Sequence, residues 1–236
     1  MNLILLFPSD FIASSVVRLS GRRFNHVCDI LKPVVNDELV VGLEGGNTGI
    51  GRVTSVDPEE LVLEVSFIHP PPVKLPVILC LALMRPIVLK RVVQTAVSMG
   101  VEAVIFFHSN RVEKSFWQST ALGHEELREQ MILGLEQAKD TVLPELFFHK
   151  KFKPFVEDAL PGLLKGRRGI AADPGGSTLA CRDGKEPLVL LIGPEGGFIP
   201  YEIEKLKAAG CSVVAMGPRI LKVETAIVAL LAKFFY

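Results

Sequence analysis

This sequence lacks an excess of charge of either sign, is poor in aromatic residues and contains only four cysteines. Its 26 Lys and Arg residues balance 26 Asp and Glu residues, so the chain as a whole has no net positive charge to attract nucleic-acid phosphates. The composition still excludes a mainly disordered chain, because 49% of the residues are hydrophobic and only 22% are charged. We therefore expect a folded protein with enough apolar material for one or two cores.

The cysteines lie far apart in the sequence and form no C-x-x-C pair. This spacing argues against a zinc site and against dithiol redox chemistry, so we expect no metal. We expect reduced, mostly buried thiols at all four positions, Cys28, Cys80, Cys181 and Cys211.

Long apolar runs are also lacking. No stretch approaches the roughly 20 apolar residues that a membrane-spanning helix requires. The apolar residues 3–7 end at Pro8 and follow no basic segment, a pattern that is too short for a signal peptide and is typical of a first strand. We expect a cytoplasmic protein that makes no contact with a membrane.

The neutral total hides a difference between two parts of the chain. Residues 1–72 contain five basic and nine acidic residues, a net charge of −4, and residues 73–236 carry the compensating +4. Three prolines at positions 70–72 separate the two parts, and consecutive prolines exclude helix and favour an extended connector. The sequence therefore predicts two domains, residues 1–72 and residues 73–236.

The first part has the pattern of a small β-rich module. Runs of β-type residues at 39–43, 49–56 and 61–67 are separated by turn signals, and residues 22–31 have helical spacing.

The second part alternates apolar runs with amphipathic segments, which is typical of a parallel sheet covered by helices. The sequence therefore predicts an α/β fold here. The expected strands are residues 77–84, 103–107, 169–172, 188–192 and 212–216; the expected helices start near Pro86 and cover 125–139, 200–209 and 223–235.

A glycine-rich segment follows the strand expected at residues 188–192. It reads G-P-E-G-G-F at residues 193–198 and leads into the helix expected from Pro200. Glycines let the backbone approach a ligand closely, and the start of a helix offers unpaired N–H groups, so the segment suits a small polar ligand. It is neither a Walker A motif nor a dinucleotide-binding G-x-G-x-x-G motif. A tight turn that needs glycine for its conformation alone is the alternative interpretation.

A second such segment, M-G-P-R-I-L-K-V-E-T-A at residues 216–226, follows the strand expected at residues 212–216. Parallel strands end at the same edge of a sheet, so we expect both segments to meet at the edge where open α/β sheets bind their ligands. Arg219 and Glu224 are the charged residues of this segment that are candidates for a catalytic role. A surface ion pair between them is the alternative interpretation.

Together, the two motifs resemble the paired signature of the 16S ribosomal RNA uridine-N3 methyltransferases, the RsmE-type branch of the SPOUT superfamily. The resemblance extends over nearly the whole chain and includes residues 94–101 and 109–114. It implies a SPOUT-type α/β domain with a C-terminal trefoil knot, preceded by a small PUA-like β-barrel domain that binds RNA. It also implies a homodimeric enzyme that uses S-adenosyl-L-methionine to methylate N3 of a uridine in small-subunit ribosomal RNA.

The resemblance assigns the methyl donor to loops of the second domain, where backbone groups make most of the contacts. The implied cofactor-binding residues are Ala172, Ile192, Gly193, Pro194, Gly196, Gly197, Met216, Gly217, Ile220 and Leu221.

Methyl transfer to uracil N3 is an in-line displacement that also requires removal of the N3 proton. Arg219 is suited to stabilise charge on the uracil oxygens, and Glu195 and Glu224 are the carboxylates of the two motifs that could accept the proton. Two other roles stay open, since Glu195 could fix its own loop and Glu224 could cap the last helix.

Basic residues of both parts are predicted to contact RNA phosphates, and other positions depart from the family pattern. Because the cofactor loops keep the pattern while RNA-facing positions change, two alternatives stay open: a methyltransferase with a different RNA target, and an RNA-binding or assembly factor that has lost catalysis. The predicted RNA contacts are Arg22, Arg23, Lys32, Arg111 and Lys114, and the departures are Asp29, Thr95, Ser98, Lys139, Asp140 and Lys222.

Overall fold

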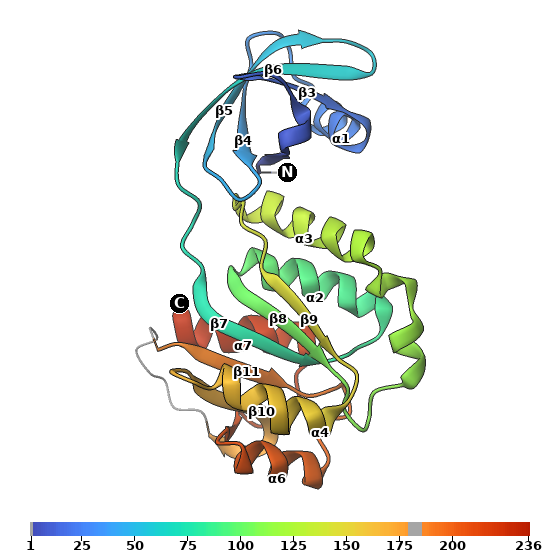
Figure 1. Cartoon of the computed structure of the whole chain (residues 1–236), viewed down its shortest axis with the longest axis vertical. Coiled ribbons are helices and arrows are strands. Elements are labelled where there is room, and N and C mark those ends of the chain that lie inside the picture. The colour runs from blue at the N-terminus through green and yellow to red at the C-terminus, as the bar shows by residue number, and fades with distance from the viewer. Residues whose placement is uncertain (1, 179–185) are drawn as a thin grey trace. The chain divides into compact units, whose positions relative to one another are not determined.

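The computed structural model describes residues 2–178 and 186–236, which form two compact units (Figure 1). The first unit comprises Met1–Val73 together with Met131–Leu143, and the second comprises Lys74–Gln130 and Pro144–Tyr236. The sequence predicts a single domain for all of residues 73–236. That assignment needs correction at residues 131–143, where the chain packs with the first unit.

The first unit is built on a six-stranded sheet with the strand order β1-β4-β5-β6-β3-β2. β1 and β4 pair in parallel, and the other neighbours are antiparallel. Its elements are β1 (Ile4–Leu6), the 3-10 turn η1 (Pro8–Asp10), β2 (Phe11–Ala13), β3 (Val16–Ser20), α1 (Gly21–Leu31), β4 (Glu38–Leu43), β5 (Thr48–Val56) and β6 (Glu60–His69).

The core of this unit follows from alternation along its strands. Alternate residues in the first part of β6 are apolar and buried, namely Leu61, Leu63 and Val65, while Phe24 and Val27 of α1 cover the same core. The expected β-runs and the expected helix are therefore confirmed. β2 and β3, which are short strands at one edge of the sheet, are not predicted by the sequence pattern.

The second unit contains a six-stranded sheet with the order β12-β10-β11-β7-β8-β9, in which every pairing is parallel. The expected α/β fold with a parallel sheet is confirmed. Its elements, with α3 shared between the units, are β7 (Leu75–Ala82), α2 (Pro86–Ser98), β8 (Val101–Phe107), η2 (Lys114–Gln118), η3 (Thr120–Leu122), α3 (His124–Ala138), β9 (Glu145–His149), α4 (Phe152–Pro154), the π-turn η4 (Phe155–Ala159), α5 (Leu160–Leu163), β10 (Arg168–Thr178), β11 (Leu188–Ile192), α6 (Pro200–Ala208), β12 (Ser212–Ala215) and α7 (Val223–Phe235).

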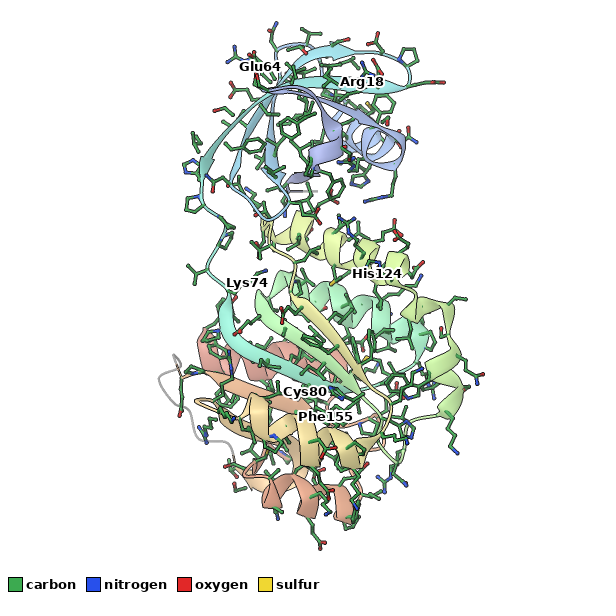
Figure 2. All side chains as sticks on the ribbon, in the orientation of Figure 1. Arg18, Glu64, Lys74, Cys80, His124 and Phe155 are labelled. Atoms are coloured by element: carbon green, nitrogen blue, oxygen red, sulfur yellow. The ribbon has the colours of Figure 1, made fainter. Side chains whose placement is uncertain are left out.

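The central strands β11 and β7 are buried over all or most of their length, as expected for a sheet with helices on both faces. All five residues of β11 are buried, and Cys80 of β7 is fully buried (Figure 2). α2 packs against β8 and against α7, which also contacts β11, while α6 packs against β12. The missed strand β9 lies at the edge, where Phe147 stays half exposed.

The cysteines in the described residues form no disulfide. Cys80 and Cys211 are buried and Cys28 is partly buried, while Cys181 lies outside the described residues. Burial raises the pKa of the Cys80 thiol and raises that of Cys211 to about 11, so both thiols are protonated at neutral pH. Neither is suited to act as a nucleophile.

Candidate functional site

Three loops meet at one edge of the parallel sheet. Residues 193–198 follow β11 and residues 216–222 follow β12, while β10, which lies between these two strands, is bulged between Ala172 and Ser177. The three strands run in the same direction, so the bulge and the loops lie toward their carboxyl ends. The expected meeting of the two glycine-rich segments at one sheet edge is confirmed.

A cavity of about 310 Å³ opens between these loops. Its wall is mainly apolar and includes Val214, Ala226 and Leu230 behind the loops. The ten residues expected to contact the cofactor all line it: Ala172, Ile192, Gly193, Pro194, Gly196, Gly197, Met216, Gly217, Ile220 and Leu221.

Glycine is required in this wall for two separate reasons. Gly197 has φ +74°, a backbone conformation that residues with a Cβ rarely adopt. A Cβ at Gly193 would lie 3.0 Å from the ring of Phe198, closer than ordinary van der Waals contact, so the ring would have to shift to admit it. Phe198 is itself buried and stacks on Phe107 of β8 with ring centroids 6.3 Å apart. The glycines therefore bring backbone groups to the cavity surface and let Phe198 pack beneath it.

Two charged residues that line the cavity have partners on the same loops. The guanidinium of Arg111 donates a hydrogen bond to the carbonyl of Gly196. Asp173 accepts a hydrogen bond from the N–H of Gly175 at 2.9 Å. Arg111 was predicted to bind RNA, and the structure brings it to the cofactor-type cavity. Asp173 follows Ala172 in one of the three loops that the resemblance assigns to the cofactor, but it was not among the predicted cofactor contacts.

The three predicted catalytic residues do not all lie at the cavity. Arg219 and Glu195 line it and are exposed, and Glu195 lies 3.8 Å from the guanidinium of Arg85. Glu224 is absent from the lining residues and pairs with Arg91 of α2 at 2.8 Å. Glu224 also lies in the first turn of α7, where a carboxylate is favoured by the helix dipole.

The alternative of an ion pair between Arg219 and Glu224 is not found, because Glu224 has a different partner. Of the two candidate bases, Glu195 is the one that the structure brings to the cavity.

The predicted RNA contact Arg23 has a structural role in the first unit and needs correction. Its guanidinium makes a two-point ion pair with buried Asp10, at 2.6 and 2.7 Å, and donates to the carbonyl of Leu5 at 2.9 Å. It also lies over the ring of Phe7, 4.5 Å from the centroid. With these partners, the guanidinium is not available to a phosphate.

The other predicted RNA contacts are exposed. Arg22 lies in the first turn of α1, and Lys32 ends that helix in the left-handed conformation with φ 48°. Lys114 begins η2 in the second unit.

Glu202 is a buried acid that the sequence analysis missed. It is 2% exposed, and its carboxylate accepts hydrogen bonds from the hydroxyl of Ser109, the N–H of Asn110 and the N–H of Ile199. These bonds join the loop after β8 to the start of α6. The bond to Ile199 follows a local pattern, since Glu202 is the third residue of α6 and accepts from the N-cap N–H, whereas the bond from Asn110 joins residues 92 apart.

Neither a metal centre nor a membrane span is found in residues 2–178 and 186–236. No three His, Cys, Asp or Glu side chains of these residues are grouped so that they could hold a metal ion. No helix among them has both the length and the apolar character to cross a membrane.

Comparison with known proteins identifies relatives over the whole chain. Residues 71–234 match the family described as RNA methyltransferase domain. The chain is 24% identical over 229 residues to the ribosomal RNA small subunit methyltransferase E 1 of Borreliella burgdorferi, covering 97% of this chain and 95% of the relative. It is 25% identical over 236 residues to the ribosomal RNA small subunit methyltransferase E of Treponema pallidum, covering 96% and 87%.

Two solved structures share the fold. One is the ribosomal RNA small subunit methyltransferase E of Neisseria gonorrhoeae bound to S-adenosyl methionine, with a TM-score of 0.77, 20% identity, and coverage of 98% of this chain and 95% of that one. The other is a methyltransferase of Legionella pneumophila in complex with the same cofactor, with a TM-score of 0.76, 22% identity, and coverage of 98% and 96%.

Proposed function

Because the chain belongs to the RNA methyltransferase domain family, we propose that it transfers a methyl group from S-adenosyl-L-methionine to N3 of a uridine in 16S ribosomal RNA. The observation that carries this proposal is the cavity between the three loops of the second unit. It is lined by the whole set of residues that the resemblance to the uridine-N3 methyltransferases implies for the cofactor.

The residues of the cavity fit this cofactor. Its apolar wall, which includes Ile192, Met216 and Leu221, suits an adenine ring, and the backbone of the glycine-rich loop offers donors and acceptors to the ring edge. Two carboxylates, Asp173 and Glu195, line the same cavity and suit the positive charges of a sulfonium and an amino group. When bound, S-adenosyl-L-methionine supplies an activated methyl group.

We assign the acceptor chemistry to the charged residues at the cavity. Arg219 is exposed on the loop after β12, where its guanidinium can bind the uracil oxygens and stabilise negative charge as N3 loses its proton. Glu195 is the better candidate than Glu224 to accept that proton, because Glu195 lines the cavity and lies 3.8 Å from Arg85, whereas Glu224 is absent from the lining and pairs with Arg91 at 2.8 Å. The rest of the catalysis comes from holding the two reactants in line.

We further propose that the first unit is a PUA-like RNA-binding domain and that the second carries a C-terminal trefoil knot. The mainly antiparallel sheet around one core supports the first of these assignments. The place of β10 between β12 and β11, and the return of α7 to β11 and α2, support the second. Arg22 and Lys32 in the first unit, with Arg111 and Lys114 in the second, are the proposed RNA contacts.

The enzyme is proposed to act as a homodimer in the cytosol, where ribosomal subunits are assembled. Exposed apolar side chains on α2, α7 and the segment before α7 support self-association: Ile87, Ile220, Leu221 and Val228. Sedimentation of the purified protein at micromolar concentration tests this, and a monomer at all concentrations would contradict it.

The function is tested by methylation of small ribosomal subunits in vitro, with labelled S-adenosyl-L-methionine and with the modified nucleotide mapped by mass spectrometry. We expect one N3-methyluridine in 16S ribosomal RNA, and its loss from a strain without the gene. A methyl group on another RNA would favour the alternative of a different target. Binding to subunits without methyl transfer would favour the assembly factor.

A further inference from the structure

A second cavity, of about 320 Å³, lies beside the first one in the same unit. The loop after β8 separates the two: Arg111 lines the first cavity, while its neighbours Asn110 and Val112 line the second. The segment before α6 also separates the two cavities, since Phe198 lines the first cavity and Ile199 lines the second. A polymeric ligand that is bound at the first cavity could therefore extend into the second.

The acidic group of the second cavity is already occupied by hydrogen bonds. Among the residues that line this cavity, Glu202 is the one acid, and its two oxygens accept from Ser109, Asn110 and Ile199. The side chain is 2% exposed, and the donors that surround it stabilise its carboxylate inside the protein. Two lysines, Lys114 and Lys153, outnumber this single acid in the lining of the cavity.

Lysines give the cavity its charge. Lys114 and Lys153 both line it and are exposed. Lys153 lies 3.9 Å from Glu157, but that carboxylate is held at 2.7 Å by Lys205, so the charge of Lys153 is only weakly compensated. The side-chain amide of Asn110 adds a donor.

His108 contributes a further donor whose proton is fixed by a neighbour. The indole N–H of Trp117 donates to Nδ1 of His108 at 3.0 Å, and an indole can only donate. Nδ1 therefore carries no proton, and the neutral imidazole has its N–H at Nε2. Burial lowers the pKa of His108, Glu202 raises it and Lys114 lowers it; the net shift is downward, which favours the neutral ring at pH 7.

We propose that the second cavity binds a phosphodiester group of the RNA substrate, next to the nucleotide that reaches the first cavity. The proposal rests on the RNA-methylating function proposed above and extends it to a named contact surface. Lys114 and Lys153 pair with the phosphate, and Asn110 and His108 donate hydrogen bonds to it. Tyr201, which is 46% exposed at the rim, offers its ring to an adjacent base.

The test compares RNA binding by the full chain and by the double variant Lys114→Gln/Lys153→Gln. The probe is a 16S ribosomal RNA fragment that the wild-type protein methylates, titrated at several salt concentrations while the fluorescence of Trp117, the single tryptophan, is recorded. We expect the Kd to rise about tenfold and the slope of log Kd against log salt to fall by about two, one for each lost phosphate contact. The single variant Lys153→Gln should give about half of the change in slope.

The matched control is Lys165→Gln, which removes the same charge from an exposed lysine of the same unit that lines neither cavity. We expect its Kd and salt slope to equal those of the wild type. The melting temperature of each variant checks that the fold is intact. In methylation assays, the double variant should raise KM for RNA far more than it lowers kcat.

The possible failures are distinguishable. If the wild type methylates RNA and the double variant matches its Kd and salt slope, the second cavity is not an RNA site while the proposed function stands. If inorganic phosphate changes the fluorescence of Trp117 but replacing both lysines leaves the RNA affinity unchanged, the cavity binds a small anion only, and the proposal is overturned. If the wild type neither binds nor methylates RNA, both proposals fall.

Discussion

Asn110 and Glu202 are joined by a hydrogen bond of 2.8 Å, from the backbone N–H that follows β8 to a buried carboxylate of α6. The same carboxylate accepts a hydrogen bond from the N–H of Ile199, at the end of the glycine-rich loop. One side chain therefore fixes the segments that separate the two cavities of the second unit. This arrangement makes the wall between the cavities a fixed part of the fold.

Replacing Glu202 by alanine is expected to destabilise the protein by about 3 kcal/mol, because buried N–H groups lose their acceptor. Chemical denaturation measures this as a lower free energy of unfolding. Glu204→Ala is the matched control, an exposed glutamate on the same helix, and it should change the free energy by no more than about 0.5 kcal/mol. Equal stabilities of the two variants would contradict a structural role for Glu202.

Gly193→Ala is expected to weaken binding of S-adenosyl-L-methionine at least about tenfold, since the added Cβ displaces the ring of Phe198 beneath the cavity. Isothermal titration calorimetry measures the change. Gly162→Ala adds the same methyl group in α5, where a Cβ meets nothing within 4 Å, and should bind the cofactor like the wild type. Wild-type affinity in the Gly193 variant would exclude this loop from the cofactor site.

Arg219→Ala is expected to lower kcat on the order of a hundredfold, because the variant loses a cation placed to stabilise the uracil anion. Single-turnover methylation of small subunits isolates this step from RNA binding. Arg219→Lys should recover part of the rate, since it keeps the charge without the planar guanidinium. A wild-type rate in the alanine variant would exclude Arg219 from catalysis.

The two candidate bases are separated by Glu195→Gln and Glu224→Gln. We expect the first substitution to lower kcat more than the second, because Glu195 lines the cavity while Glu224 pairs with Arg91. The dependence of kcat on pH supplies a second readout: a lost base removes the acidic limb of the profile, and a lost ion pair leaves it in place. A larger effect at Glu224 would reverse the assignment.

Glu136→Gln is expected to raise the melting temperature at pH 7. Burial raises the pKa of this carboxyl, so the folded state favours its protonated form. The cost of ionising it is absent below the unfolded pKa of about 4.3 and is complete above the folded pKa. The gain should therefore vanish when melting is measured near pH 4. Exposed Glu59→Gln is the control and should show no gain at either pH.

Periodicity and turn residues predict much of the second unit, because the relevant interactions are local. The buried run at β11 and the helix from Val223 to Phe235 were predicted with their observed bounds. The glycine-rich loops can be recognised in the sequence because a position with a positive φ, such as Gly197, or one where a Cβ would be crowded favours glycine. Parallel pairing then brought those loops to one edge without knowledge of any side-chain contact.

The rest depends on partners that are distant along the chain. Arg23 looks like a phosphate contact in the sequence, and only the fold brings the buried carboxylate of Asp10 to it. Asp173 and Glu202 look like ordinary acids, and the fold places the first at a cavity and buries the second. Edge strands such as β9 were missed because half-exposed apolar residues give neither a buried run nor a clean alternation.

The return of residues 131–143 to the first unit affects the order in which the protein folds during synthesis. The N–H of Leu3 donates to the carbonyl of Glu136 at 3.1 Å, and the N–H of Gly45 donates to the carbonyl of Thr141 at 2.8 Å. The first unit therefore cannot be completed when residue 73 leaves the ribosome. Its last packing surface emerges only after β7 and β8 of the second unit have been made, so the first unit can finish folding only when part of the second has already been synthesised.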